Sequence, residues 1–430
     1  MTPTIGITLA ILAFLIVMLF THKIPYGMAA MICCIAFVVT GIADIPTAFS
    51  GFSSSTTILV ATMMVIGIAL GKTSIIHKLK GILNNMQGKK GIALVATICV
   101  ITFALSQMMG QTEVMTLMVI FLTNLSDESE VSPARMLFTA AVINTVATAK
   151  LPIGIGLSST GTINGLYSGF VADESQLLGL MDYFKAGIVP CIICFVYCLL
   201  FYKLLPSQKM NTEAASIGDI KADESISKKD EMIIFACFFA VLAGYALTNV
   251  IGFTISNIIP AICVVVLLLT KVLTMKEAVS TMTSDIVFMI AGMQAVSTVL
   301  SSTGVGNLIG EMVLSILGGN PSAIMVISVF CIVTTIMTNF ISNMGTMALM
   351  IPIAAATALA GGFNVKTIVL VTAVSSWFSI AFPTGSGATL IAFGVGNFKF
   401  GETLKFTLPL ILLLMISLII SINAFFPVFA

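Results

Sequence analysis

Hydrophobic runs recur along this chain from Ile5 to Phe429. Hydrophobic residues make up 58% of the sequence and charged residues only 9%, well below the roughly 25% of a typical soluble domain. The longest polar stretch, from Ser207 to Asp230, is only the size of a linker. The sequence therefore predicts an all-α, polytopic helical membrane protein without a soluble domain. The first run has neither a basic leader nor a small-residue cleavage site, so we expect no cleavable signal.

Polar breaks divide the apolar runs into plain spans, short arms and broken spans. The expected plain spans are 5–20, 26–42, 57–70, 184–205, 232–248, 253–270, 284–300 and 406–426. The remaining elements are a weakly amphipathic stretch at 72–90, short arms at about 92–125 and 322–362, a short glycine-interrupted segment at 305–317, and broken spans at 136–170 and 367–398.

The arms between Ile324 and Gly362 have about 15 residues each, whereas a membrane-spanning helix needs about 20. They meet at a polar join, where a lipid-exposed helix would carry Leu or Val. Non-helical backbone persists at membrane depth only where it is buried in protein or lines a watery cavity. We therefore interpret this segment as a re-entrant helical hairpin with its tip at Ser342–Met344. Two short kinked spans with a polar turn at the surface are the alternative.

The two halves of the chain contain the same order of parts. Residues 1–205 form the first predicted repeat and residues 232–430 the second, with a cytoplasmic linker at 206–231. Setting Ser106 against Thr338 places the polar joins of the two halves opposite each other. Each half has an odd number of crossings in addition to one hairpin. The sequence therefore predicts two inverted repeats, each with a re-entrant hairpin and a broken transmembrane helix.

The basic residues predict which loops face the cytoplasm. If the N-terminus lies outside, sixteen Lys and Arg residues fall in inner loops and two in outer loops, which is a strong positive-inside bias. We therefore expect a protein of the cell (inner) membrane with both termini outside. The inner residues are Lys23, Lys72, Lys78, Lys80, Lys89, Lys90, Arg135, Lys203, Lys209, Lys221, Lys228, Lys229, Lys271, Lys276, Lys399 and Lys405, and the outer ones are Lys185 and Lys366.

These parts resemble the divalent anion:sodium symporters, the sodium-coupled dicarboxylate, citrate and sulfate carriers of the ion transporter superfamily. In the second half, Thr338–Thr346 (TNFISNMGT) looks like the family hairpin and Pro383–Thr389 (PTGSGAT) like its broken helix. The first half departs from the family pattern, with Gly110–Thr112 (GQT) at the tip and Pro152–Thr162 (PIGIGLSSTGT) at the break.

The resemblance implies an elevator-like transporter that works as a homodimer. It assigns Ser342 and Asn343 to contact a substrate carboxylate and to help coordinate sodium, with Gln111 and Thr112 as weaker counterparts. Met344 replaces the family threonine, which removes one hydroxyl contact.

The residue types suit this chemistry. Helix N-termini and hydroxyl or amide side chains supply donors for an anion, and unwound glycine-rich backbone supplies carbonyl oxygens for sodium. For any one cluster the alternative is that Gly, Ser and Thr simply pack membrane helices together. The predicted substrate-binding residues are Ser342, Asn343, Gln111, Thr112, Ser158, Ser159, Thr384 and Ser386. The predicted ion-binding residues are Gly110, Gly154, Gly156, Ser342, Asn343, Gly385, Gly387 and Thr389.

Two charges interrupt the repeat and are candidate coupling charges. Glu113 stands where the second half has Gly345, and Lys150 where it has Ala381. Ionisable groups at membrane depth are costly and usually functional. One interpretation is that Lys150 supplies the positive charge that sodium brings in the first half, or that Glu113 carries a coupling proton. The other is a structural Glu113–Lys150 ion pair.

The sequence offers few residues for a metal site, a catalytic triad or nucleotide binding. With only His22 and His77, we expect neither a transition-metal site nor a histidine triad, and we expect no cofactor and no nucleic-acid partner. All nine cysteines lie in apolar runs. The Gly71–Ser74 segment resembles a phosphate loop, but its spacing is wrong and it ends a membrane span. Trp377 and the methionines show no pattern that we could interpret.

The sequence thus predicts a secondary transporter, not an enzyme, with a small anion and the lipid bilayer as its partners. C4-dicarboxylates are the expected substrates, coupled to sodium or to a proton. A sodium/proton antiporter with Glu113 as the proton carrier is the alternative. An intramembrane enzyme would need a nucleophile–base pair or paired acids at depth, and the sequence offers neither.

Overall fold

The computed structural model describes residues 3–21, 23–74, 91–123, 131–153, 155–171, 173–210, 226–247, 251, 253–319, 321–427 and 429. Each predicted plain span coincides with a helix, with bounds that agree to within six residues. Most of the predicted amphipathic stretch, Gly154 and most of the predicted linker lie outside the described residues.

The described chain is nearly all helical and contains no strand, in agreement with the predicted all-α class. The first half contains α1 (Pro3–Thr21), α2 (Tyr26–Val39), α3 (Ile45–Ala48), α4 (Ser55–Gly71), α6 (Gly91–Leu105), α7 (Gln111–Thr123), α8 (Pro133–Ala147), α9 (Gly156–Tyr167) and α10 (Asp182–Phe201). The second half contains α11 (Lys228–Ala246), α13 (Phe253–Leu269), α14 (Met275–Met282), α15 (Asp285–Ser302), α16 (Val305–Ile316), α17 (Ala323–Thr338), α18 (Asn343–Gly361), α19 (Val365–Ser375), α20 (Gly387–Val395) and α21 (Phe400–Phe425). Single 3₁₀ turns are η1 (Ser50–Ser53), η2 (Ser168–Phe170), η3 (Glu174–Gln176) and η4 (Tyr202–Leu204).

Four helical segments among the described residues are long and apolar enough to cross a membrane: Asp182–Leu204, Met275–Ser302, Asn343–Gly361 and Phe400–Phe425. The third of these corrects the expected arm length, because α18 has 19 residues instead of about 15. It is nevertheless 72% buried inside the protein, so little of it can face lipid. Re-entry of this segment into the membrane stays a prediction.

Local sequence signals set the turns and the breaks. α6 and α7 are joined by a turn at Ser106–Gly110, and α17 and α18 by one at Asn339–Ser342. The broken spans separate into α8 and α9, with the first break at 148–155 between them, and into α19 and α20, with the second break at 376–386. α8 ends at Ala147 and α19 at Ser375, well ahead of Pro152 and Pro383, and each proline then disfavours the α conformation for the residue before it inside the break. A serine N-cap then starts the next element, as Ser386 does for α20.

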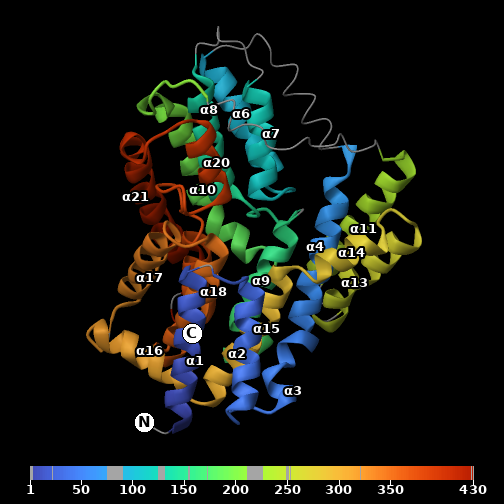
Figure 1. The fold of residues 1–430 in the computed structure, drawn as a ribbon, viewed down its shortest axis with the longest axis vertical. Helices are drawn as coiled ribbons and strands as arrows, with labels where there is room; N and C mark the ends of the chain where they lie inside the picture. Colours follow the sequence, from blue (N-terminus) through green and yellow to red (C-terminus); the bar gives the residue numbers. More distant parts are fainter. Residues whose placement is uncertain are drawn as a thin grey trace.

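The helices form several packed groups, and α2 with α15 and α16 with α18 pack together at the end opposite α6 and α8 (Figure 1). α4 packs with α11, α13 and α14 along one side of the molecule. α6, α7, α8, α20 and α21 gather at one end. α9 packs against α18 and α20 packs against α7, so the helix that follows the break of each half meets the second hairpin arm of the other. Two structural repeats would be expected to pack in this reciprocal way. The inversion of the repeats stays a prediction.

Two elements differ from the sequence expectation. α14, which was not predicted, is a short surface helix with a capping box between Thr274 and Glu277. α16 is continuous, although its glycines suggested an interruption. Gly310 instead allows close packing, because a Cβ there would lie 2.6 Å from the Ala356 carbonyl oxygen of α18.

Candidate functional site

The second hairpin turn and the second break meet around Asn343, the first residue of α18. Asn343 is buried, and its amide nitrogen lies among four oxygens. Nδ2 can donate to the carbonyl oxygens, which an amide oxygen in that position could not. Two protein segments therefore direct four oxygen atoms at one point. The distances from Nδ2 are 2.6 Å to Ser379 Oγ, 3.0 Å to Thr338 Oγ1, 3.1 Å to the Gly385 carbonyl and 3.2 Å to the Ser376 carbonyl.

An amide side chain ties each turn to the break of its own half. Gln107 does this in the first half and Asn339 in the second, and both are buried. Gln107 donates to the Ala147 carbonyl (2.9 Å) and accepts from Leu151 N (3.0 Å), and Asn339 donates to the Phe378 carbonyl (3.2 Å) and accepts from Ala381 N (3.0 Å). The bonds of Leu151 and Ala381 set Lys150 opposite Ile380, whereas those of Ala147 and Phe378 set it opposite Ala381, so its place in the repeat stays a prediction.

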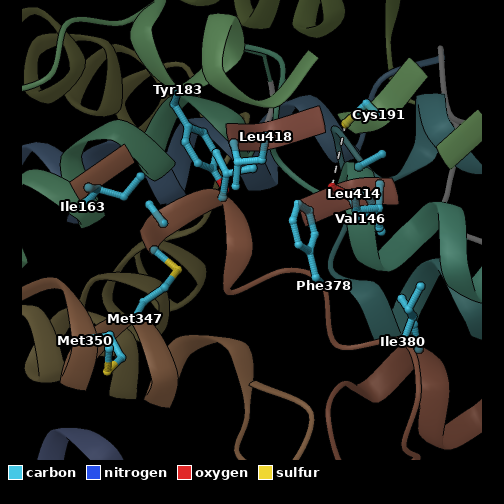
Figure 2. Packing of buried hydrophobic residues seen from close by; sticks show 14 of the residues in the cluster. Val146, Ile163, Tyr183, Cys191, Met347, Met350, Phe378, Ile380, Leu414 and Leu418 are labelled. Carbon is cyan, nitrogen blue, oxygen red and sulfur yellow. Dashed lines mark hydrogen bonds between the residues drawn. The ribbon is translucent and has the colours of Figure 1, made fainter. Parts of the chain in front are cut away.

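A cavity of about 350 Å³ lies between the first turn, the first break and the start of α18. Its wall includes Gly110 from the first turn, Met344 near the start of α18 and Trp377 from the second break. Tyr183 of α10 and Met347 of α18, both in the wall, also belong to the buried cluster drawn in Figure 2. The polar side chains in the wall are Glu113, Thr148, Ser158, Ser159, Thr162 and Thr281.

Lys150 is buried directly behind this wall, with only 3% of its surface exposed. Its Nζ donates to the Tyr183 hydroxyl at 2.8 Å and to the Thr148 carbonyl at 3.3 Å. It also lies 4.7 Å from the centre of the Tyr183 ring and 4.8 Å from that of Trp377, both within cation–π range. An aromatic and oxygen shell thus holds the ammonium at the edge of the cavity.

The backbone of the first break is strained at Ala149, which lines the same cavity. Its φ of 55° lies in the left-handed region that favours glycine. Ala149 N is held by the Ser106 carbonyl at 3.2 Å, so the turn of the hairpin stabilises this conformation.

Glu113 and Lys150 do not form the ion pair that the sequence left open. No contact within 4 Å joins these two described side chains. Glu113 lies in the first turn of α7, where the helix dipole favours an acid. Its carboxylate folds back over Gly110, where a Cβ would lie 2.3 Å from Oε2. The carboxylate is exposed in the cavity wall, and the ammonium is buried behind another part of it.

Of the predicted site residues, Gly110, Glu113, Ser158 and Ser159 line the cavity. Ser342 is the N-cap of α18: its Oγ accepts from Gly345 N at 3.1 Å and lies 2.6 Å from the Tyr26 hydroxyl. Gln111 begins α7, and its Nε2 is buried without a partner among the described residues. Gly154 lies outside the described residues.

The other predicted residues support the backbone around the breaks. Thr384 donates to the Asn339 carbonyl at 3.1 Å, and Ser386 and Thr389 form the capping box of α20. Gly387 makes room for Thr112, whose Oγ1 would lie 2.8 Å from a Cβ at that position. These residues are absent from the cavity wall, so direct substrate contact by them stays a prediction.

Sequence reasoning missed Thr148, Thr162, Tyr183, Trp377 and Ser379. Thr148 and Ser379 lie within the predicted broken spans, so a search of those spans for hydroxyl residues could have found them. Tyr183 and Trp377 carried no local signal, because they reach Lys150 only through the packing of α10 and the second break.

Comparison with known proteins identifies the family and the fold. The profile of the CitMHS family, described as citrate transporters, matches residues 15–375 and 247–429. Human solute carrier family 13 member 4 is 27% identical over 153 residues, which cover 35% of this chain and 24% of that protein. The transporter YfbS of Escherichia coli is 27% identical over 141 residues, covering 33% and 23% respectively. The chain thus matches only about a quarter of the length of these relatives.

Two solved structures share the fold at low sequence identity. The YdaH transporter of Alcanivorax borkumensis superposes with a TM-score of 0.59 and 15% identity over 90% of this chain and 87% of that one. MtrF of Neisseria gonorrhoeae superposes with a TM-score of 0.62 and 13% identity over 92% and 86%. These structures show the fold, and the family match confirms the resemblance seen in the sequence: the chain belongs to the CitMHS family, described as citrate transporters, among the divalent anion:sodium symporters, and is an integral membrane protein.

Proposed function

We propose that this chain is a secondary active transporter that couples the movement of a small dianion, with C4-dicarboxylates as the substrate class, to sodium. The observation that carries the proposal is the cavity of about 350 Å³ that touches the first hairpin turn, both breaks and the start of α18. Its size is in the range of small-molecule sites, and its hydroxyl groups can donate to a carboxylate.

Helix starts supply the remaining donors. α7 begins at Gln111 and α9 at Gly156, and the residue before each of them, Gly110 and Ile155, lines the cavity. Free backbone N–H groups and the positive end of the helix dipole favour an anion at such places. An anion bound here needs no arginine.

The oxygen cluster around Asn343 supports sodium as the coupling ion. Ser376 is the C-cap of α19, and its carbonyl belongs to the negative end of that helix. If the amide of Asn343 turned, its Oδ1 would face the carbonyls of Ser376 and Gly385, and only a cation between them would relieve the repulsion. Hydroxyl, amide and unwound-backbone oxygens are the donors that suit sodium in transporters.

An elevator-like motion and a homodimer complete the proposal, and both rest on the family resemblance. The unit that would move consists of the hairpins, the broken helices, α10 and α21. The Tyr26–Ser342 contact joins this unit to α2, which belongs to the part that would stay fixed.

A sodium/proton antiporter is the second candidate, because Glu113 presents an exposed carboxylate to the cavity. Such a protein would exchange protons for sodium without any anion. It would depend on Glu113 and not on the hydroxyl groups of the wall.

Uptake of labelled succinate into proteoliposomes tests the proposal, with an inward sodium gradient compared with a sodium-free control at fixed pH. We expect uptake that requires sodium and that Asn343→Ala reduces by about tenfold or more, the effect of losing roughly 1.4 kcal/mol of binding. Asn423→Ala is the matched control, because that exposed amide bonds only to a carbonyl of its own helix, α21.

The outcomes separate the candidates. Equal loss in Asn343→Ala and Asn423→Ala would contradict the assigned sodium site. Sodium-driven proton movement without succinate uptake, abolished by Glu113→Gln, would favour the antiporter. Uptake of citrate or sulfate in place of succinate would change the substrate class and keep the transporter.

A further inference from the structure

Lys150 is a buried ammonium without a carboxylate partner. It is 3% exposed, and no acidic group among the described side chains lies within 4 Å of its Nζ. An unpaired buried charge is strongly destabilising unless other polar groups compensate it. In a membrane protein, such a buried ammonium indicates a function that needs a fixed positive charge.

The packing of α10 leaves space for the Lys150 side chain. A Cβ at Gly187 of α10 would lie 2.8 Å from Lys150 Cδ, so glycine at that position leaves space for the lysine stem. At the far end, the Tyr183 hydroxyl and the Thr148 carbonyl accept from Nζ, and the rings of Tyr183 and Trp377 flank it. Carbonyl and phenol oxygens together with ring faces stabilise a monovalent cation.

Each break exposes the C-terminal end of a helix, which faces Lys150 in the first half and Asn343 in the second. Thr148 is the C-cap of α8 and Ser376 the C-cap of α19, so each break exposes the negative end of a helix dipole. In the second half, the Ser376 carbonyl belongs to the oxygen cluster around Asn343. In the first half, the Thr148 carbonyl faces the ammonium of Lys150.

We propose that Lys150 is a resident cation that takes the place of one coupling ion, so that transport uses a single sodium site, at Asn343. This inference rests on the proposed sodium coupling. The fixed charge lies directly behind the cavity wall and stabilises a dianion in the cavity in every state of the cycle. A carrier with two exchangeable cations would have to rebind both of them in each cycle.

Binding of radioactive sodium to the purified protein, without substrate, tests the stoichiometry. We expect one sodium ion per chain in the wild type and in Lys185→Ala, which removes an exposed lysine from the same helix as Gly187. Asn343→Ala should bind none. Two ions per chain in the wild type would overturn the inference.

Chemical rescue tests the role of the charge itself. Propylammonium matches the atoms that Lys150→Ala removes, and propanol has a similar shape without the charge. We expect Lys150→Ala to fold, to transport about tenfold or more slowly, and to recover with propylammonium but not with propanol. Lys185→Ala should transport at the wild-type rate and respond to neither compound.

Three results would overturn the role of Lys150: unchanged transport in Lys150→Ala, equal recovery with propanol, or no recovery in a folded protein whose Lys150→Arg variant is equally inactive. An active Lys150→Arg would support it, because that variant keeps the charge. A wild-type protein that binds no sodium would contradict the proposed sodium coupling, and the rescue result would still decide the role of Lys150.

Discussion

At the scale of single residues, the first break depends on backbone contacts that leave no room for a side chain. A Cβ at Gly156 would lie 1.8 Å from the Leu151 carbonyl oxygen. The neighbouring strain at Ala149 shows that this loop is held in an unusual conformation. Glycine at 156 is therefore a structural requirement of the break, whether or not it also lies near an ion.

We expect Gly156→Ala to lower the stability of the protein by about 1–3 kcal/mol, because the clash is with backbone and cannot be relieved by a rotamer change. Gly394→Ala is the matched control, since a Cβ there meets nothing within 4 Å and alanine favours helix. Thermal unfolding of the two purified variants tests this, and we expect a lower melting temperature for Gly156→Ala than for Gly394→Ala. Equal melting temperatures would contradict the assigned clash.

At the scale of elements, α2 and α18 are linked at their N-termini. Asp285 accepts from the backbone N–H groups of Tyr26 (3.1 Å) and Gly27 (2.8 Å) and so fixes the start of α2 on α15. The Tyr26 hydroxyl then lies 2.6 Å from Oγ of Ser342, the N-cap of α18. In an elevator motion the Tyr26–Ser342 contact must break, whereas the two bonds to Asp285 remain.

Tyr26→Phe removes that contact and leaves the α18 cap intact. A neutral hydrogen bond contributes about 1 kcal/mol, so the variant should shift the balance between the two states about fivefold away from the one described. A cysteine at Ser158 in the cavity wall reports the shift as a changed rate of labelling by an impermeant reagent. The native cysteines are all buried, which keeps the background low.

Tyr197→Phe is the control for this shift. It also loses a tyrosine hydroxyl bond, 3.0 Å to the Phe406 carbonyl, but the bond joins α10 to α21 within the unit proposed to move. It should leave the labelling rate unchanged. The same rate for both variants would mean that the Tyr26–Ser342 contact does not distinguish the two states.

Most helices and turns were predictable from the sequence, because they depend on residues close together in the chain. Apolar length predicts the helices, Pro152 and Pro383 mark the segments in which the breaks lie, and small polar residues mark the turns. The lining of the site was less predictable, because Tyr183 and Trp377 meet Lys150 only after distant helices pack. α14 was missed because its pattern is amphipathic and short, unlike a membrane span.

At the scale of the whole molecule, loops predicted to share a side of the membrane lie together. Ser132 donates to the Gln208 carbonyl and Gln208 to Glu402, so three predicted inner segments meet. Lys185 and Lys366, the two predicted outer lysines, line one surface cavity together with residues at the end of α21. α10 and α21 pack side by side and run from one of these groups to the other in opposite directions.

The charge bias predicts which of these groups faces the cytoplasm, and cysteine labelling of intact cells can test it. We expect an impermeant maleimide to label Lys185→Cys and Lys366→Cys in intact cells, because the positive-inside bias puts both outside. Lys209→Cys and Lys399→Cys, which belong to the other group, should react only after permeabilisation. The wild-type chain, whose cysteines are all buried, is the control for background.

The reverse labelling pattern would invert the predicted orientation in the membrane and keep the fold. Labelling of one cysteine from each group in intact cells would contradict the separation of the two groups by a membrane, and with it the crossing of α10 and α21.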